Sequence, residues 1–333
     1  MQQVVSSEEL LAAALQVYEQ GKHPLTAMFG RDETLNGAGY AIYCCFEVPE
    51  KRDVHIVKGV FPADGSLSYE SLTHAIPAAA WYEREIHDMF GLVPEGHPDL
   101  RPLVLHESFP EDFHPLRKSV AVNAKVRGER KFKIRTAKGQ GLFQVPVGPI
   151  HAGIIEPGHF RFSQAGEAML QLDAKLFFTH RGIEKAVEGK TPEEALHIVE
   201  RICGACSVAN TWSFCQAVER AIGVAVPRRA EIIRTLLSEL ERITNHVGDL
   251  GNMPAGVGFN PAISLGSRLK EQLMRLCEAV AGNRFLRGVI VPGGVRQDIT
   301  PELIEHIHEV MDATAQGVED LAAMFREQEN FQN

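Results

Sequence analysis

Residues 200–206 of this chain, ERICGAC, place two cysteines, Cys203 and Cys206, three positions apart. Side chains at that spacing point to one side of a helical turn, so both sulfur atoms can bind one metal ion. Thiolates suit soft or borderline metals such as nickel, iron and zinc. Taken by itself, the pair leaves four alternatives open: structural cysteines, half of a zinc site, a dithiol redox site, or a site for another metal.

The surrounding sequence weakens two of these alternatives. A structural zinc ion needs two more ligands at compact spacing, and no second Cys-x-x-Cys or His-x3-His follows. A thioredoxin-like motif follows a strand, whereas residues 192–199 have the apolar pattern of a helix. Cys215 and Cys277 are isolated, and we expect both to be core thiols.

Composition excludes several classes of protein. The chain has 333 residues, with 34 Lys+Arg against 43 Asp+Glu and a net charge of -9, which argues against a nucleic-acid binder. Its length suggests two domains. Six unevenly spaced cysteines are too few for a secreted disulfide framework.

The N-terminus and the hydropathy pattern bear on localisation. Glu8 and Glu9 stand where a secretory signal needs basic and then apolar residues. No window approaches the roughly 18 uninterrupted apolar residues of a transmembrane helix. We therefore expect a cytoplasmic chain that reaches a membrane only through a surface or a partner.

The patterns predict an α+β N-terminal domain. We expect a helix over 6–18, paired strands over 39–48 and 54–61, and a helix over 77–90 that Gly91 ends. In the last helix, Trp81 and three other apolar residues share one side. The acidic residues, including Glu83 and Glu85, face elsewhere, either as a solvated surface or as a docking face.

A mainly α-helical domain is expected to follow. Helical patterns cover residues 163–178, 192–222, 228–248, 262–281 and 301–328. Before them, residues 117–138 hold nine Lys or Arg and one acid, Glu129. This run is either a solvated connector or a basic tether for an acidic partner or anionic lipid.

A second candidate site lies in residues 148–160, GPIHAGIIEPGHF. Gly and Pro at this density fix a tight backbone. A glutamate in such a loop near a metal can pass protons if burial raises its pKa, which makes Glu156 a candidate acid. An ordinary surface turn is the alternative, and His151 and His159 alone do not decide between them.

Residues 201–206 resemble the first metal-binding motif of the nickel–iron (NiFe) hydrogenase large subunit. Other stretches are similar to the membrane-bound, energy-converting (group 4) hydrogenases and to their relative, the 49-kDa subunit of complex I. These stretches are residues 148–162, 179–185, 227–246 and 292–298. Retention of both Cys203 and Cys206 favours the hydrogenase branch, because 49-kDa subunits have lost the nickel ligands.

The N-terminal half resembles another complex I subunit. Residues 83–91, 97–101 and 115–118 are similar to the signature of the 30-kDa subunit. The order of the two resemblances is that of formate hydrogenlyase-type large subunits and of fused complex I subunits. It implies a 30-kDa-like domain over 1–118, a basic linker over 119–140, and an incomplete 49-kDa/hydrogenase-like domain over 141–333.

The resemblance implies an oxidoreductase that forms or oxidises H2. One of the thiolates of Cys203 and Cys206 would bind nickel terminally and the other would bridge nickel and iron. Glu156 aligns with the acid proposed to relay protons, and Arg201 and His151 are further candidate catalytic residues. Electrons would leave through an iron–sulfur cluster in a small subunit similar to the 20-kDa subunit of complex I.

Further partners follow from the same resemblance. Other cluster-bearing and membrane subunits would hold the chain on the cytoplasmic face of the inner membrane. We expect no nucleic-acid partner and no direct NAD binding, because no Gly-x-Gly-x-x-Gly fingerprint follows a predicted strand.

Two departures from the hydrogenase pattern are visible. Asn210 stands where the family has a histidine four residues after the second cysteine, which bears on the contact with the partner's cluster. The second cysteine pair, Asp-Pro-Cys-x-x-Cys, is absent, and family members continue beyond the position of Asn333. We expect a truncated chain that is inactive in isolation.

Two alternative functions remain. One is a complex I-like NADH:quinone oxidoreductase subunit, in which the loop around His151 lines a quinone cavity. The other is a non-catalytic scaffold paralogue that keeps the fold and holds no metal.

Overall fold

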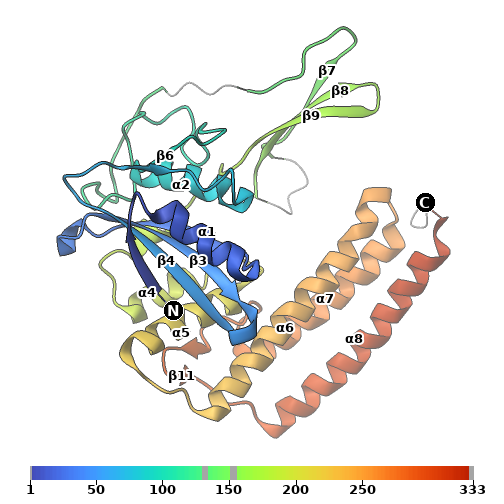
Figure 1. The fold of residues 1–333 in the computed structure, drawn as a ribbon. Coiled ribbons are helices and arrows are strands. Elements are labelled where there is room, and N and C mark those ends of the chain that lie inside the picture. Colours follow the sequence, from blue (N-terminus) through green and yellow to red (C-terminus); the bar gives the residue numbers. More distant parts are fainter. Residues whose placement is uncertain (1, 130–133, 151–155, 330–333) are drawn as a thin grey trace. The chain divides into compact units, whose positions relative to one another are not determined.

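The structure, a computed structural model, describes residues 2–129, 134–150 and 156–329 (Figure 1). The chain forms two compact units, Met1–Lys185 and Ala186–Asn333. Each unit has its own apolar interior: one buried cluster in the N-terminal unit and two in the C-terminal unit. The prediction that an α+β part is followed by a mainly helical part is confirmed.

The N-terminal unit is built on a four-stranded sheet with the strand order β1-β4-β3-β2. The strands are β1 (Gln2–Ser6), β2 (Leu25–Asp32), β3 (Tyr40–Val48) and β4 (Asp53–Phe61). β1 runs parallel to β4, and the other pairs are antiparallel. The predicted pairing of strands at 39–48 and 54–61 is therefore confirmed.

Two helices, α1 (Leu10–Gly21) and α2 (Ala80–Phe90), cover one face of this sheet. Ile42 pairs with Gly30 on one side and with Gly59 on the other, so all three residues point to the same face. The side chain of Leu10 lies over Gly59, and the ring of Phe90 lies over Gly30. The core of the unit therefore lies between the helices and this face.

The polar side of α2 differs from the prediction. Glu83 is fully buried and accepts hydrogen bonds from Leu72 N–H and from the hydroxyls of Ser71 and Thr73. Trp81, expected on the apolar side, is 55% exposed. The pattern failed here because loops distant in sequence supply donors to buried acids, and a docking face that includes Glu83 is ruled out.

The prediction of a helix over 163–178 is wrong. The structure instead has a three-stranded antiparallel sheet of β7 (Phe143–Val147), β8 (His159–Ala165) and β9 (Ala168–Lys175). Ala165 pairs with Ala168, so Gly166 and Glu167 make a two-residue turn in which Gly166 has a φ of 60°. Such a turn uses residues with positive φ, which glycine adopts at low cost.

Ion pairs tie this small sheet to the irregular segment before it. Asp173 of β9 pairs with Arg101 at 2.9 Å, and Lys175 pairs with Glu107. These contacts group residues 141–175 with the N-terminal unit, whereas the resemblance groups them with the helical domain. The unit also contains β5 (Ser68–Glu70), which is parallel to β6 (Val93–Glu95), and α3 (Ile183–Val187), which ends just past the boundary between the units.

The basic run has partners within its own unit. Residues 119–129 and 134–140 contain no helix or strand. Arg117 donates to the carbonyl of Phe90 at 2.7 Å, and Arg135 pairs with Asp99 at 3.2 Å. Part of the run is therefore bound to the protein surface and is not a fully solvated connector.

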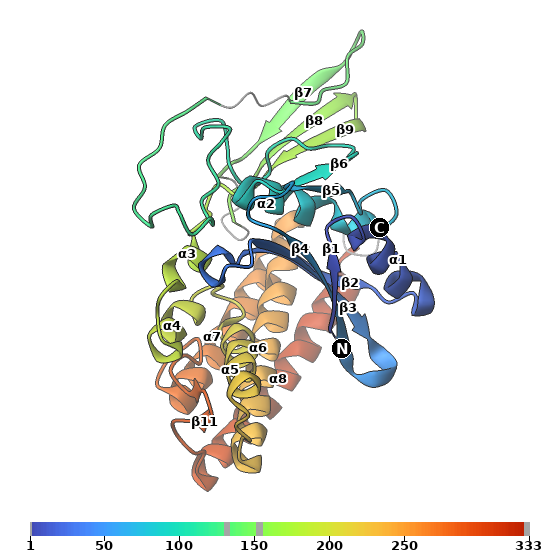
Figure 2. The same ribbon diagram turned by 60° about the vertical axis from the view of Figure 1, so that its left-hand side comes forward.

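The C-terminal unit is helical. Its helices are α4 (Pro192–Val199), α5 (Ser207–Ile222), α6 (Arg228–Asn252), α7 (Asn260–Ala281) and α8 (Pro301–Glu327), and a short hairpin pairs β10 (Ile290–Val291) with β11 (Gly294–Val295). Figures 1 and 2 show α6, α7 and α8 side by side, with α7 in contact with both neighbours. The helices predicted beyond residue 228 are confirmed, whereas the one predicted over 192–222 is broken at 200–206.

Two features fix the position of α6. A Cβ atom built on Gly266 of α7 would lie 2.1 Å from Cα of Gly251, so the two helices approach too closely there for any side chain. Near its other end, the buried Arg234 binds Glu219 of α5, with N–O distances of 2.6 and 3.1 Å, and also the carbonyl groups of the hairpin. Together these contacts hold α5, α6 and α7 in one arrangement.

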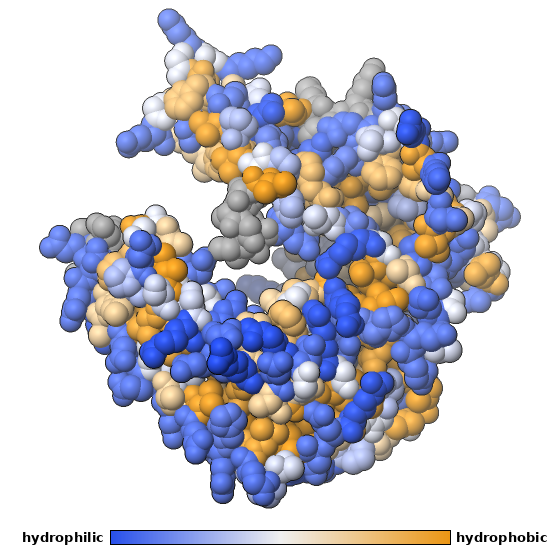
Figure 3. Space-filling model, turned by 180° about the vertical axis from the view of Figure 1, so that it is seen from behind, coloured by the Kyte–Doolittle hydropathy of each residue, from blue (hydrophilic) through white to orange (hydrophobic). Residues whose placement is uncertain are grey.

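Apolar side chains of the three-stranded sheet are exposed, among them Phe143, Met169, Leu170 and Leu172 (Figure 3). Among the described residues, no helix combines the length and the apolar character that a bilayer span requires.

Candidate functional site

The cysteine pair lies in the connection between α4 and α5, not within a helix as predicted. Thr191 and Glu194 form a capping box that starts α4, which ends at Val199. Cys206 is the residue before the first turn of α5, and its φ of -133° and ψ of 45° are neither helical nor extended. We call residues 203–206 the cysteine turn.

The two thiols of the cysteine turn affect each other's pKa. Burial raises the pKa of Cys203, but hydrogen bonds from the Cys206 thiol and from the N–H groups of Ala205 and Cys206 outweigh it, so the pKa is lowered. Burial and the neighbouring Cys203 sulfur raise the pKa of Cys206 to about 11. Deprotonation therefore occurs first at Cys203.

Asn210, which replaces the expected histidine, contacts the second thiol. Its side-chain amide donates to the carbonyl of Cys206 at 2.8 Å and to Sγ of Cys206 at 3.3 Å. The second contact stabilises a thiolate and lowers the pKa of Cys206 against the effect of burial. Asn210 is thus a direct neighbour of a candidate ligand, a role that the sequence pattern alone did not indicate.

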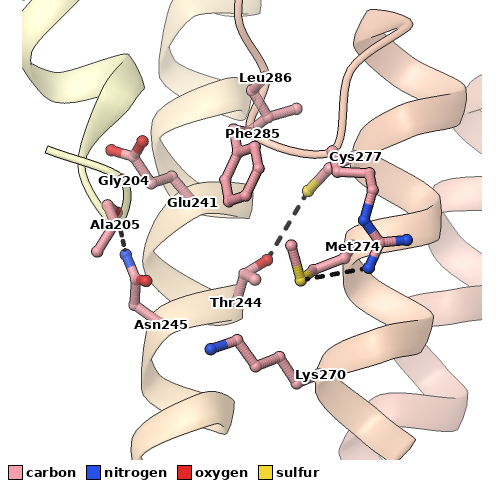
Figure 4. Close-up of a pocket in the computed structure, with 11 residues that line it drawn as sticks. Gly204, Ala205, Glu241, Thr244, Asn245, Lys270, Met274, Cys277, Phe285 and Leu286 are labelled. Atoms are coloured by element: carbon pink, nitrogen blue, oxygen red, sulfur yellow. Dashed lines mark hydrogen bonds between the residues drawn. The ribbon is translucent and has the colours of Figure 1, made fainter. Parts of the chain in front are cut away.

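A cavity of about 390 Å³ lies beside the cysteine turn. Figure 4 shows Gly204 and Ala205 on one side of it, with residues from α6 and α7 opposite. Cys277 lies on the α7 side, 2% exposed, with its sulfur 3.8 Å from the hydroxyl of Thr244. Burial raises the pKa of Cys277, and the prediction that Cys215 and Cys277 are buried thiols is confirmed.

The three candidate catalytic residues have different settings. Arg201 is half-exposed and donates to the carbonyl of His197, at the end of α4. Glu156 belongs to the N-terminal unit, where it is exposed and pairs with Arg181 at 3.3 Å. His151 lies outside the described residues.

The donor set fits part of a metal site. Cys203 and Cys206 can supply two thiolate ligands to one ion. In the part of the chain that the structure describes, no group of three or more His, Cys, Asp or Glu side chains is arranged to hold a metal. The described residues thus offer two thiol donors, fewer than a closed metal site requires.

Three family models match successive parts of the chain. Residues 3–126 match the 30-kDa subunit of respiratory-chain NADH dehydrogenase, and residues 181–249, which include the cysteine turn, match nickel-dependent hydrogenase. Residues 257–333 match the 49-kDa subunit of respiratory-chain NADH dehydrogenase. The chain thus carries, in order, the family domains of a fused 30-kDa/49-kDa subunit.

The relatives of the chain include hydrogenase subunits as well as subunits of NADH-quinone oxidoreductase. The chain is 39% identical to hydrogenase-4 component G of Escherichia coli over 86% of its length, and 35% identical to formate hydrogenlyase subunit 5 of the same organism over 85%. It is 28% identical to the fused C/D subunit of the NADH-quinone oxidoreductase of Phocaeicola vulgatus over 87%. By name, these relatives are subunits of oxidoreductases.

The matches cover only part of each relative. They span 52% of hydrogenase-4 component G, 50% of formate hydrogenlyase subunit 5 and 59% of the C/D subunit. The chain thus spans about half the length of the relatives it matches.

Proposed function

We propose that the chain forms part of the large subunit of a membrane-associated NiFe hydrogenase complex. This complex forms or oxidises H2 and passes electrons to an iron–sulfur partner subunit. The supporting observation is the pair of thiols, Cys203 and Cys206, in one turn within the segment that matches nickel-dependent hydrogenase.

The residues of the chain have distinct roles in this proposal. When bound, the Ni–Fe centre supplies Lewis-acid polarisation of H2. Cys203 and Cys206 hold the centre through their thiolates, and Cys203 loses its proton first. Arg201 fixes the start of the turn through the His197 carbonyl. Glu156 and His151 act as proton carriers.

The proposal includes the partners and the domain limits. A small iron–sulfur subunit receives the electrons, and further cluster-bearing and membrane subunits hold the chain at the cytoplasmic face of the inner membrane. Residues 1–118 form the 30-kDa-like domain, 119–140 the basic linker, and 141–333 the beginning of the hydrogenase-like domain. The multisubunit names of the relatives support this assignment.

A complex I-like quinone-site subunit is the second candidate. It is favoured by the match of residues 257–333 to the 49-kDa subunit and by the similarity to C/D subunits. In that case, the loop around His151 lines a quinone cavity and the thiols hold no nickel.

Nickel content distinguishes these candidates. The protein is purified with its native complex, and nickel per chain is measured by mass spectrometry for the wild type, Cys203→Ser and Cys206→Ser. Since each thiolate is a ligand, both substitutions should remove nearly all nickel. Cys45→Ser, which changes a half-buried thiol on β3, is the control and should retain it.

Other results would reject the hydrogenase proposal. Wild-type complex without nickel, combined with inhibition that competes with quinone, would establish the complex I-like function. A complex with neither nickel nor quinone-dependent activity would indicate a scaffold.

A further inference from the structure

The helix facing the cysteine turn presents two polar side chains to it. Glu241 and Asn245 are four residues apart on α6, so they lie on the same side of that helix. Figure 4 shows both projecting toward the turn, beside Gly204 and Ala205. The turn itself belongs to a connection without regular hydrogen bonding, so its shape depends on such contacts from outside.

Glu241 replaces the missing cap of α5. The first N–H groups of a helix have no partner within it, and the side chain of the preceding residue normally accepts from them. Here that residue is Cys206, whose side chain makes no capping bond. The two carboxylate oxygens of Glu241 instead accept from the N–H groups of Val208 at 2.7 Å and Ala209 at 3.1 Å.

This replacement leaves the Cys206 thiol free of a capping role. A sulfur that accepted from the helix N–H groups would point along the axis of α5 and would compete with a metal for its lone pairs. Because Glu241 satisfies those donors, the Cys206 side chain can turn toward Cys203.

Asn245 fixes the middle of the turn. Its side-chain amide donates to the carbonyl of Ala205, the residue between Gly204 and the second cysteine. On the opposite flank, the Ser207 hydroxyl donates to the carbonyl of Cys203 at 3.2 Å, and Arg287 donates to that hydroxyl at 3.2 Å. The peptide groups of the turn are thus held from two directions.

We propose that Glu241 and Asn245 are positioning residues that hold the sulfur atoms of Cys203 and Cys206 at the separation that a shared metal ion needs. The inference rests on the proposed metal-binding role of the two thiols. Neither residue is a metal ligand, and both act through the backbone of the turn.

The test uses Ni²⁺ alone as the probe and the thiolate-to-nickel absorption band as the readout. The full chain is titrated as wild type, Glu241→Gln, Asn245→Asp and Asn245→Ala. Loss of such supporting contacts typically weakens metal binding by about 10- to 100-fold. Glu241→Gln keeps the size of the side chain but turns one acceptor into a donor that faces an N–H group.

Two substitutions of Asn245 distinguish a positioning role from a packing role. Asn245→Asp keeps the shape but places a carboxylate against the Ala205 carbonyl, so it should weaken Ni²⁺ binding more than Asn245→Ala does. A packing role would give the opposite order, because alanine removes more atoms. Controls on the same helix are Glu239→Gln, at a side chain that is 47% exposed, and Asn252→Ala, at an exposed residue; both should leave affinity unchanged.

The outcomes distinguish this inference from the proposed function. If wild type binds Ni²⁺ and Cys203→Ser does not, the thiols are ligands, and unchanged affinity in Glu241→Gln and Asn245→Asp would then reject the positioning role. If Cys203→Ser binds as tightly as wild type, the proposed metal-binding role itself fails. Thermal unfolding of each variant shows whether the C-terminal unit is intact, and an Asn245→Asp variant that unfolds like wild type and still binds weakly supports the inference.

Discussion

Asp88 is a buried acid on which three consecutive peptide groups converge. Its Oδ2 accepts from the N–H groups of Leu103, Val104 and Leu105 at 2.8, 2.8 and 3.1 Å. The side chain is 1% exposed, so no water can replace it. An acid on α2 therefore organises a loop fifteen residues away in sequence.

Asp88→Ala should destabilise the N-terminal unit strongly. A buried donor without a partner costs about 1–3 kcal/mol, and this substitution leaves three. We expect a loss of at least about 3 kcal/mol, measured by urea unfolding. Glu50→Ala, at an exposed turn between β3 and β4, is the control; an equally small change in both variants would contradict the assignment.

Asn210 gives a prediction about thiol reactivity. Its amide lowers the pKa of Cys206, so Asn210→Ala should raise that pKa and reduce the thiolate fraction at pH 8. Alkylation of Cys206 by iodoacetamide should slow, by about tenfold for one pKa unit. Peptide mass spectrometry measures the rate at each cysteine, and Cys206 alkylation in Asn252→Ala should match wild type. A faster reaction in Asn210→Ala would show that the amide shields the sulfur instead of activating its thiolate.

At the scale of single residues, the Cys-x-x-Cys spacing points to the two candidate thiols but not to the residues that contact their turn. The pattern Cys-x-x-Cys is local, so Cys203 and Cys206 could be named from the sequence. Glu241 and Asn245 reach the turn from a helix more than thirty residues later, and nothing local signals that contact. The same limit explains Glu83, whose donors are in residues 71–73.

Among the elements, α5 and α6 are joined by a buried ion pair. Arg234 is 1% exposed and Glu219 is 5% exposed. Removing one member of such a pair leaves an uncompensated buried charge and costs about 3–5 kcal/mol. Arg234→Met should therefore lower the stability of the C-terminal unit by this amount in urea unfolding, and adding Glu219→Gln should restore part of it. No recovery in the double variant would contradict the pairing.

The same pair predicts a pH dependence. Burial raises the pKa of Glu219, but the hydrogen bonds from Arg234 and Gly293 outweigh it and the pKa lies below 4.5. A carboxylate with a lowered folded pKa contributes stability above its unfolded pKa and loses it as the pH falls through the folded value. Thermal unfolding of wild type and Glu219→Gln should thus differ most above pH 4.5 and converge below it.

Substitutions of glycine where α6 and α7 cross test how tightly the two helices pack. Gly266→Ala places a methyl group against the backbone of α6 and should cost about 1–3 kcal/mol. Gly248 is the matched control, because a Cβ there meets only the flexible side chain of Lys270. Gly248→Ala should be neutral or stabilising through helix propensity, and equal losses at both glycines would argue against a close crossing.

Elements with one clear periodicity could be predicted from the sequence. The alternating strands at 39–48 and 54–61 and the long amphipathic helices fall close to their expected limits. The sheet at 143–175 was missed because Ala168, Met169, Leu170 and Gln171 favour helices as isolated residues, and the hairpin is set by Gly166 and by pairing across strands.

Over the whole molecule, the two units have separate cores and should unfold separately. Calorimetry should show two transitions. Asp88→Ala should lower only one of them and Arg234→Met only the other, because each residue belongs to a different unit. A single transition that both substitutions shift would show that the units unfold cooperatively.

At this scale, the order of the two resemblances was visible in short motifs, and the family models confirm it. The limits of the two compact units were not visible in such motifs. These limits depend on contacts between segments far apart in the sequence, such as the ion pair between Asp173 and Arg101, which are 72 residues apart.

The cap that Glu241 provides also bears on how such a protein can change over evolutionary time. Most helices begin at a residue whose own side chain secures the first turn, and replacing that residue loosens the helix. The side chain at position 206 does not cap α5, so a lineage can exchange this cysteine and still keep the helix intact. One scaffold can in this way gain or lose a cysteine at a candidate metal site without losing its architecture.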